Sequence, residues 1–480
     1  MQSEILIAKL FMKTAFKNKA VFILTIFIGL LLIFATFSGW RNFKNQNEMK
    51  AKYQAQSRKD WLSNPNKHPH RMAHFGNFAF RPKAPLSVFD FGMESFFGNS
   101  IYLEAHKQNT TNFSEAGFST GLLRFGEISI AMILQVLLPL LIFFLGFSSI
   151  ASERENGTLK ILLSQGMSWK QLILGKSYGL IGVVMTLFVP LMIAISLLWV
   201  IIQGNNITGE EILRLGLIIL SYFVYLCIFC VIAVLISAIS KTSKTALTSL
   251  IGLWLMLTVV LPRASQALGK AIYSTPSKAK FESVIDEDIV KVGDSHNSND
   301  PHFKSLKDSV LAVYKVDSIT QLPFNYGGFQ MKEGEKISAN IYQKHQNELL
   351  AIYDQQNSFS KGMAFFNPFM AIKNLSMALS NTDFASYVDF QQQAEAFRYH
   401  MTEEMNELQM KYISNEAKSS AGQINIIDKK HWEDLHDFQY QSSSITKVFK
   451  NEYISILALL FWLGLLSFFI RLLSKNLKAI

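Results

Sequence analysis

The chain has 480 residues, of which 49% are hydrophobic and only 17% are charged. Its mean hydropathy is positive, which is unusual for a soluble protein of this length, so membrane segments are expected. The formal net charge of +10 does not indicate nucleic acid, because membrane proteins gather lysine beside the cytoplasmic ends of their helices.

Residues 1–20 are predicted to form a cytoplasmic amphipathic helix. Their lysines recur every four residues on one helical face, and apolar residues share the neighbouring face: Ile5, Ala8, Met12 and Phe16. A basic amphipathic helix of this kind lies on the inner membrane surface. A plain cytoplasmic tail is the alternative.

Six stretches are long and apolar enough to cross the membrane, which takes roughly 20 residues as a helix. Only helices satisfy their own backbone hydrogen bonds in lipid, so the predicted fold class is an all-α polytopic membrane protein. The first stretch is longer than a signal-peptide core, and we expect it to be retained. The predicted spans are residues 21–40, 128–150, 178–202, 215–239, 246–261 and 454–473.

Lysine and arginine gather on one side of these spans. They precede the first span, lie between the second and third and between the fourth and fifth, and follow the sixth. The opposite short loop, residues 203–214, carries Glu210 and Glu211 against a single arginine. The positive-inside rule therefore predicts that both termini, including the tail 474–480, are cytoplasmic.

Two polar regions are expected on the other side of the membrane. Residues 41–127 contain prolines that are predicted to divide them into loops and short elements. Residues 263–450 are predicted to be helical, because apolar residues such as Ala394, Phe397 and Met401 recur at steps of three or four. We therefore expect six transmembrane helices with a large, mainly helical extracytoplasmic domain.

The loop between the second and third spans, residues 151–177, is more than a polar connector. Ser152 with Glu155 fits a capping box that would begin a helix, and Gly157 would end that helix. Gly166 allows a further turn. Composition alone does not distinguish an ordinary capped turn from a rigid knob that contacts a soluble partner. The polar contacts of such a knob would come from Glu153, Arg154 and Glu155.

The loop sequence SERENGTLKILLSQG resembles the characteristic loop of permeases in the type-2 ABC exporter family, ABC-2. The resemblance implies a coupling helix that docks on an ATPase dimer, with ATP and Mg bound by that partner and no cofactor in this chain. It also implies a second permease, identical or related, surrounding membrane lipid, a bacterial inner-membrane location and outward transport. The residues expected to couple to the ATPase are Glu153, Arg154, Glu155, Gly157, Thr158, Leu159, Leu163, Gly166 and Lys176.

Motifs outside the membrane resemble one branch of that family, whose large extracytoplasmic domain has no known activity. They include HPHRMAHFGNFAFRPKAPL, N-P-F at residues 367–369 and T-D-F at residues 382–384. The residues that mark this motif are His74, Gly76, Pro82, Asp90, Gly92, Glu104 and His106.

Three patterns imitate functional sites. Gly175-Lys176-Ser177 copies the end of a P-loop, but the glycine that the motif needs at position 170 is a lysine, so no ATP site is expected in this chain. Cys227 and Cys230 lie inside the fourth span and are expected to pack there. The histidines at positions 68, 70, 74 and 106 suit copper or zinc, but no acidic or cysteine ligand is closely spaced with the first three. Structural or surface roles are favoured for them, and no metal is expected.

Other classes of membrane protein fit less well. An intramembrane enzyme needs ionisable groups at membrane depth, whereas the spans offer Gln135, Tyr222 and Tyr225 without aspartate, histidine or lysine. A secondary transporter would need inverted repeats and mid-membrane charges, and neither is evident. The expected function is the non-catalytic permease subunit of an ATP-driven exporter. The alternative is a scaffold or mechanotransmission subunit that acts on a periplasmic partner without transport.

Overall fold

The computed structural model describes residues 2–15, 17, 19–109, 128–204, 207–416 and 425–477. Within this part of the chain, six helices are long and apolar enough to span a membrane. Together with the helical remainder they confirm the predicted all-α polytopic fold class. The six run over Phe22–Leu62, Ile130–Glu155, Trp169–Gln203, Gly209–Ile239, Ser243–Ile272 and Ile445–Asn476.

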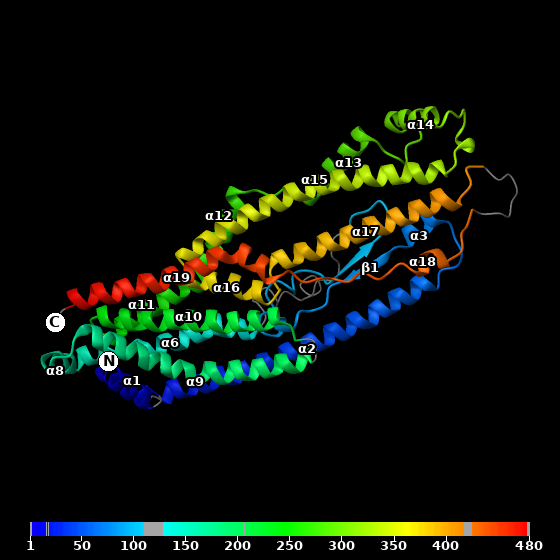
Figure 1. Cartoon of the computed structure of the whole chain (residues 1–480). Coiled ribbons are helices and arrows are strands. Elements are labelled where there is room, and N and C mark those ends of the chain that lie inside the picture. The colour runs from blue at the N-terminus through cyan, green and yellow to red at the C-terminus, as the bar shows by residue number, and fades with distance from the viewer. Residues whose placement is uncertain are drawn as a thin grey trace.

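The molecule is elongated, with a helical bundle at one end and an outer part at the other (Figure 1). The bundle end carries α1 (Gln2–Ala15), α8 (Thr158–Ser164) and the C-terminal end of α19 (Ile445–Asn476). The opposite end carries α3 (Pro69–Phe75), α14 (Pro301–Tyr314) and α18 (Lys430–Glu433). One end of the molecule therefore carries the N-terminal helix, the loop 151–177 and the end of the C-terminal helix. This is the arrangement expected if all three lie on the same side of the membrane.

Two long helices continue past the predicted span ends. Helix α2 (Lys19–Leu62) has 44 residues, and at 1.5 Å per residue it is about 66 Å long. The prediction of loops and short elements is therefore wrong for residues 41–62, because no proline or glycine interrupts the helix before Pro65. The fifth span helix likewise continues past Arg263 to Ile272.

The remaining elements connect these helices. The outer part contains a two-stranded antiparallel sheet, in which β1 (Asn77–Phe80) pairs with β2 (Ser100–Leu103). Helices α15 (Tyr326–Gly362) and α17 (Phe384–Tyr412) run side by side from the bundle into the outer part (Figure 1). The further described elements are η1 (Pro85–Val88), α5 (Ile130–Met132), η3 (Ile133–Leu137), α6 (Leu138–Gly146), α7 (Ala151–Glu155), α9 (Trp169–Gln203), α10 (Gly209–Ile239), α11 (Ser243–Leu255), η4 (Met256–Val260), α12 (Leu261–Ile272), α13 (Lys278–Val292), η5 (Ile319–Gln321), η6 (Met363–Phe365) and α16 (Pro368–Leu379).

The buried apolar residues form two separate cores. One fills the bundle, and the other holds the outer part together around Trp61, Met72, Phe390 and Trp432. The Trp61 indole N–H donates to the Trp432 carbonyl at 2.8 Å, which joins α2 to α18. The outer part thus has its own hydrophobic core, to which α2 connects the bundle without a break.

Helix α16 lies within the bundle, although the sequence assigned all of residues 263–450 to the outside. It packs against α10 and α19, and Phe369, Ile372 and Leu375 are buried in the bundle core. This position was not visible in the sequence, because α16 is only 12 residues long. The bundle therefore contains α16, a short helix that does not span the membrane, in addition to its span helices.

Helix α1 packs along α9 and does not stand free of the bundle. Its half-buried side chains include Ile7, Ala8 and Phe11, whereas Ile5 of the predicted apolar face is 48% exposed. Phe16 of that face lies outside the described residues. The prediction of a helix is confirmed, but its contact face is turned toward Ile7 and Phe11.

Candidate functional site

Two short helices form the predicted loop 151–177 before α9: α7, which is the last part of the second span helix, and α8, which follows it. Gly157 separates α7 from α8, and its φ of +73° is the left-handed conformation that glycine adopts without strain. The predicted break at Gly157 is confirmed. The capping box is wrong, because Ser152 lies inside α7 and its hydroxyl donates to the Ser148 carbonyl at 2.6 Å.

The acidic residues of α7 bind two different span helices. Glu153 forms a salt bridge with Lys176 of α9, and both side chains are mostly buried. Glu155 accepts a hydrogen bond from the Ser243 hydroxyl, at 2.5 Å, where α11 begins. Both carboxylates therefore have partners within the chain.

Arg154, between these two residues, binds the end of α10. Its guanidinium donates to the Ala238 carbonyl at 2.7 Å and to the Ser240 carbonyl. The last carbonyls of a helix lack helical partners and carry the negative end of the helix dipole, so a cation is favoured there. The guanidinium also lies 5.8 Å from the centroid of the Trp169 ring. Three consecutive side chains of α7 thus contact α9, α11 and α10.

Helix α8 is held to the bundle by one apolar side and exposes the other. Leu159 is fully buried and Leu163 is half-buried, whereas Thr158 and Lys160 are exposed. Ile161 is 56% exposed at the end of the molecule. Gly166 ends the α8 segment with a φ of +86°, as its predicted turn requires. The exposed surface of this loop therefore includes one side of α8 and Glu155 of α7, whereas Glu153 and Arg154 are half-buried.

A chain of hydrogen bonds crosses the bundle core. The Gln135 amide donates to the Tyr222 hydroxyl at 2.6 Å, Tyr222 donates to Ser376 at 2.8 Å, and Ser376 donates to Asp90 at 2.5 Å. Gln135 lies in η3, a π-helical turn, and the Tyr225 hydroxyl donates to its carbonyl at 2.7 Å. Such π turns are frequent at functional sites of helices. The chain joins η3, α10, α16 and the segment before the second span.

A second π-helical turn, η4, is connected to the first. The Asn367 amide donates to the Leu257 carbonyl within η4 at 2.7 Å, and the Trp254 indole donates to the Val136 carbonyl within η3 at 2.9 Å. Asn367, of the N-P-F motif, also caps α16 by accepting from the Phe369 N–H. Helix α16 therefore links the two irregular turns of the bundle.

Comparison with protein families agrees with this arrangement. Residues 98–279, which include the loop with α7 and α8, match the family described as ABC-2 family transporter protein. Over residues 98–279 the chain belongs to the ABC-2 transporter permeases. Residues 280–441 match a domain of unknown function, DUF3526. The predicted resemblance is thus confirmed for both regions. A comparison with curated proteins finds no match.

The marker residues of the permease's outer motif fall into two groups. The first group lies beside α16, where Asp90 binds Ser376. Gly92 has a φ of +52°, and a Cβ added to it would lie 2.3 Å from the Thr382 hydroxyl oxygen, so only glycine fits. Pro82 is half-buried in the segment between β1 and the turn that precedes Asp90. These residues hold the outer segment against the bundle.

The second group lies near the sheet of the outer part. Gly76 has a φ of +66°, and a Cβ there would lie 2.4 Å from the Leu103 carbonyl oxygen. Glu104 and His106 follow β2, and His74 lies near the end of α3. Of the four histidines considered in the sequence, three lie together, while His68 caps α3 by accepting from the His70 N–H.

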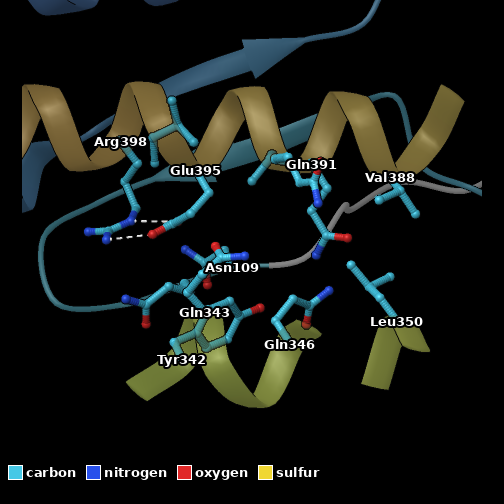
Figure 2. A pocket seen from close by; sticks show the side chains of 13 residues that line it. Asn109, Tyr342, Gln343, Gln346, Leu350, Val388, Gln391, Glu395 and Arg398 are labelled. Atoms are coloured by element: carbon cyan, nitrogen blue, oxygen red, sulfur yellow. Dashed lines mark hydrogen bonds and ion pairs between the residues drawn. The ribbon is translucent and has the colours of Figure 1, made fainter. Parts of the chain in front are cut away.

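A pocket that the sequence did not indicate lies between α15 and α17 of the permease. Figure 2 shows its 13 side chains, of which six are amides, including Asn109, Gln343, Gln346 and Gln391. Arg398 lies at one end of the pocket, where Glu395 accepts two hydrogen bonds from its guanidinium at 2.8 Å. The residues come from distant parts of the chain, and no local motif connects them.

Proposed function

We propose that this permease is the membrane-spanning subunit of an ATP-driven exporter and carries no catalytic chemistry itself. A separate ATPase dimer binds ATP and Mg, and a second permease, identical or related, completes the complex in the bacterial inner membrane. Both termini and the loop 151–177 face the cytoplasm, where lysines gather. The observation that carries the proposal is the contact of residues 153–155 with three span helices.

Docking uses the exposed side of α8. An isoleucine that is 56% exposed at the end of a helical bundle offers apolar area to a partner, and Thr158 and Lys160 add polar contacts beside it. The buried Leu159 fixes α8 to the bundle, so a displacement of α8 also moves the bundle helices that it contacts. Glu153 and Arg154 act inside the chain, as connections to the span helices.

Transmission then passes through α7. Its salt bridge to Lys176 moves α9, the bonds of Arg154 move the end of α10, and the bond of Glu155 moves the start of α11. ATP binding shifts the population between two arrangements of these helices, because the ATPase binds one arrangement more tightly. The π-helical turns and α16 carry the change toward the outer part, and substrate leaves on that side.

A second function is favoured by one specific observation. Helix α2 runs without a break from the bundle to Trp61 in the outer core. A rigid connection of this kind moves the outer part whenever the bundle moves, so the complex acts mechanically on a periplasmic partner without transport. Both functions use the same coupling at α7. They differ in whether reconstituted vesicles move a substrate across the membrane.

The docking proposal is tested by charge substitution on α8. Ile161→Glu should abolish co-purification of the ATPase, because a carboxylate replaces the apolar contact. Val313→Glu is the matched control, because Val313 is 76% exposed on α14 at the opposite end of the molecule. Equal recovery of the ATPase with both variants would contradict docking at α8.

The transmission proposal is tested by Arg154→Met, which removes the bonds to α10 and keeps much of the side chain's length. The ATPase should remain bound and hydrolyse ATP, but ATP should no longer change the labelling of a cysteine introduced at Phe366, which is 69% exposed beside α16. An unchanged ATP-dependent response in this variant would show that the helices are coupled by another route.

A further inference from the structure

We infer that His70, His74 and His106 form a binding site for a divalent cation that prefers imidazole, Zn²⁺ or Cu²⁺, in the outer part of the molecule. The site depends on neither the docking surface nor the π-helical turns. It lies at the end of the molecule opposite α8 (Figure 1). Its presence or absence therefore leaves the proposed coupling unchanged.

The distances among the three rings fit a metal site. His70 and His74 are four residues apart on α3, and their Nε2 atoms lie 3.2 Å from each other. One nitrogen from each of the three rings lies within 4.8 Å of the others. Tetrahedral zinc with Zn–N bonds of 2.0–2.1 Å separates its nitrogen ligands by about 3.3 Å. One pair is therefore already at ligand spacing, and the third nitrogen needs a shift of about 1.5 Å.

His106 is held in the orientation of a metal ligand. It follows β2 with a φ of +61°, and Glu335 accepts hydrogen bonds from both its backbone N–H and its Nδ1, at 3.1 and 3.0 Å. This fixes the proton on Nδ1 and leaves the lone pair on Nε2. That Nε2 is buried and has no hydrogen-bond partner among the described residues. Metal-binding histidines commonly donate their other ring nitrogen to a carboxylate in this way.

Glu335 is itself fixed by a second charge. Its side chain is fully buried, and its carboxylate lies 2.7 Å from the guanidinium of Arg398, which is only 1% exposed. A buried carboxylate is costly unless it is paired and hydrogen-bonded, and here Arg398 supplies the charge and His106 the hydrogen bonds. Glu335 is therefore a fixed acceptor for the His106 ring.

Packing of the rings alone does not account for these features. A hydrogen bond between His70 and His74 explains their spacing, but it leaves the Nε2 of His106 without a partner. His296, from the loop between α13 and α14, packs with its ring centroid 4.8 Å from that of His106, but it is not one of the three histidines whose nitrogens lie within 4.8 Å of one another.

The test uses the full chain, purified without a polyhistidine tag and washed with a chelator. After equilibration with Zn²⁺ or, separately, with Cu²⁺, the metal content is measured by mass spectrometry and the affinity by titration calorimetry. We expect about one metal ion per chain. His106→Ala and His74→Ala should each weaken binding by more than tenfold, and Glu335→Gln should weaken it by about 10- to 100-fold. The matched control is His400→Ala, since His400 is exposed on α17 away from the cluster.

Two measurements on the unmodified chain test the metal site even if a variant does not fold. Co²⁺ bound to the unmodified chain should give the intense visible absorption of tetrahedral coordination, and bound Cu²⁺ should show nitrogen hyperfine splitting in its electron paramagnetic resonance spectrum. The tighter of the Zn²⁺ and Cu²⁺ titrations identifies the metal. Folded wild-type protein that retains neither ion, or a folded His106→Ala variant that binds as tightly as wild type, would overturn the site.

Discussion

The packing of α1 on α9 depends on glycines whose replacement has a calculable effect. A Cβ added at Gly179 would lie 2.8 Å from the Cβ of Phe11 and 3.0 Å from the carbonyl oxygen of Ala8. Carbon atoms in contact are normally 3.5–4.0 Å apart, so Gly179→Ala requires α1 to retreat by about 1 Å. Overpacking of this kind costs about 1–3 kcal/mol. Because 1.4 kcal/mol corresponds to a factor of ten, the undocked population should rise roughly 5- to 150-fold.

This change is measured by the rate of maleimide labelling of Ala8→Cys, with Cys227 and Cys230 replaced by alanine. Ala8 is half-buried at the contact, so a reagent reaches the probe when α1 leaves α9. Helix α1 has 14 residues, close to the limit for a stable isolated helix, and none of its residues is fully buried. Its docking is therefore weak enough for the variant to alter it measurably.

A graded series of glycines supplies the control. Gly175→Ala should act as strongly as Gly179→Ala, because its Cβ would lie 2.7 Å from the Cβ of Ile7. Gly182→Ala should act less, since its nearest neighbour is the flexible end of Met12. Gly216→Ala in α10 has nothing within 4 Å and should leave labelling unchanged. Equal labelling rates in the Gly179→Ala and Gly216→Ala variants would refute this account.

Two further predictions concern the bundle and the outer segment around Gly92 that packs against it. Tyr222→Phe and Ser376→Ala should each lower the unfolding temperature in detergent, and the double variant should lose less than the sum, with a coupling of about 0.6–1.7 kcal/mol; strict additivity would exclude the hydrogen-bonded chain. Gly92→Ala should prevent accumulation of folded protein, because its Cβ would lie 2.3 Å from the hydroxyl oxygen of Thr382. Gly157→Ala also has a positive φ but nothing within 4 Å, so it should cost only about 1–2 kcal/mol and remain folded; equal yields of the two glycine variants would contradict the contact.

The sequence predicted the elements that lipid imposes and missed those that depend on distant partners. Hydropathy located the six span helices, because a membrane helix must be both long and apolar. It did not locate α16, whose 12 residues are too few to cross a bilayer. Charge and glycine positions located the loop 151–177 and its break at Gly157. The partners of Arg154 are 84 and 86 residues away, so its inward role was not visible.

The same limit applies to the polar groups. Gln135 and Tyr222 were noticed as isolated polar residues of the spans, but Ser376 is 154 residues from Tyr222 and Asp90 is 286 residues from Ser376. The four-residue spacing of His70 and His74 was a local signal of a shared helical face. Their connection to His106 depends on the sheet, and Glu335 reaches that histidine across 229 residues. Only the folded chain brings these groups together.

The central claim, that the exposed side of α8 is where an ATPase docks, is tested most directly by crosslinking. A photoreactive amino acid replaces Ile161 in the intact complex, and the same residue replaces Val313 on the opposite end as a control. We expect an adduct at position 161 that contains a nucleotide-hydrolysing subunit, with none at position 313. A complex that hydrolyses ATP yet gives no such adduct at position 161 would contradict it.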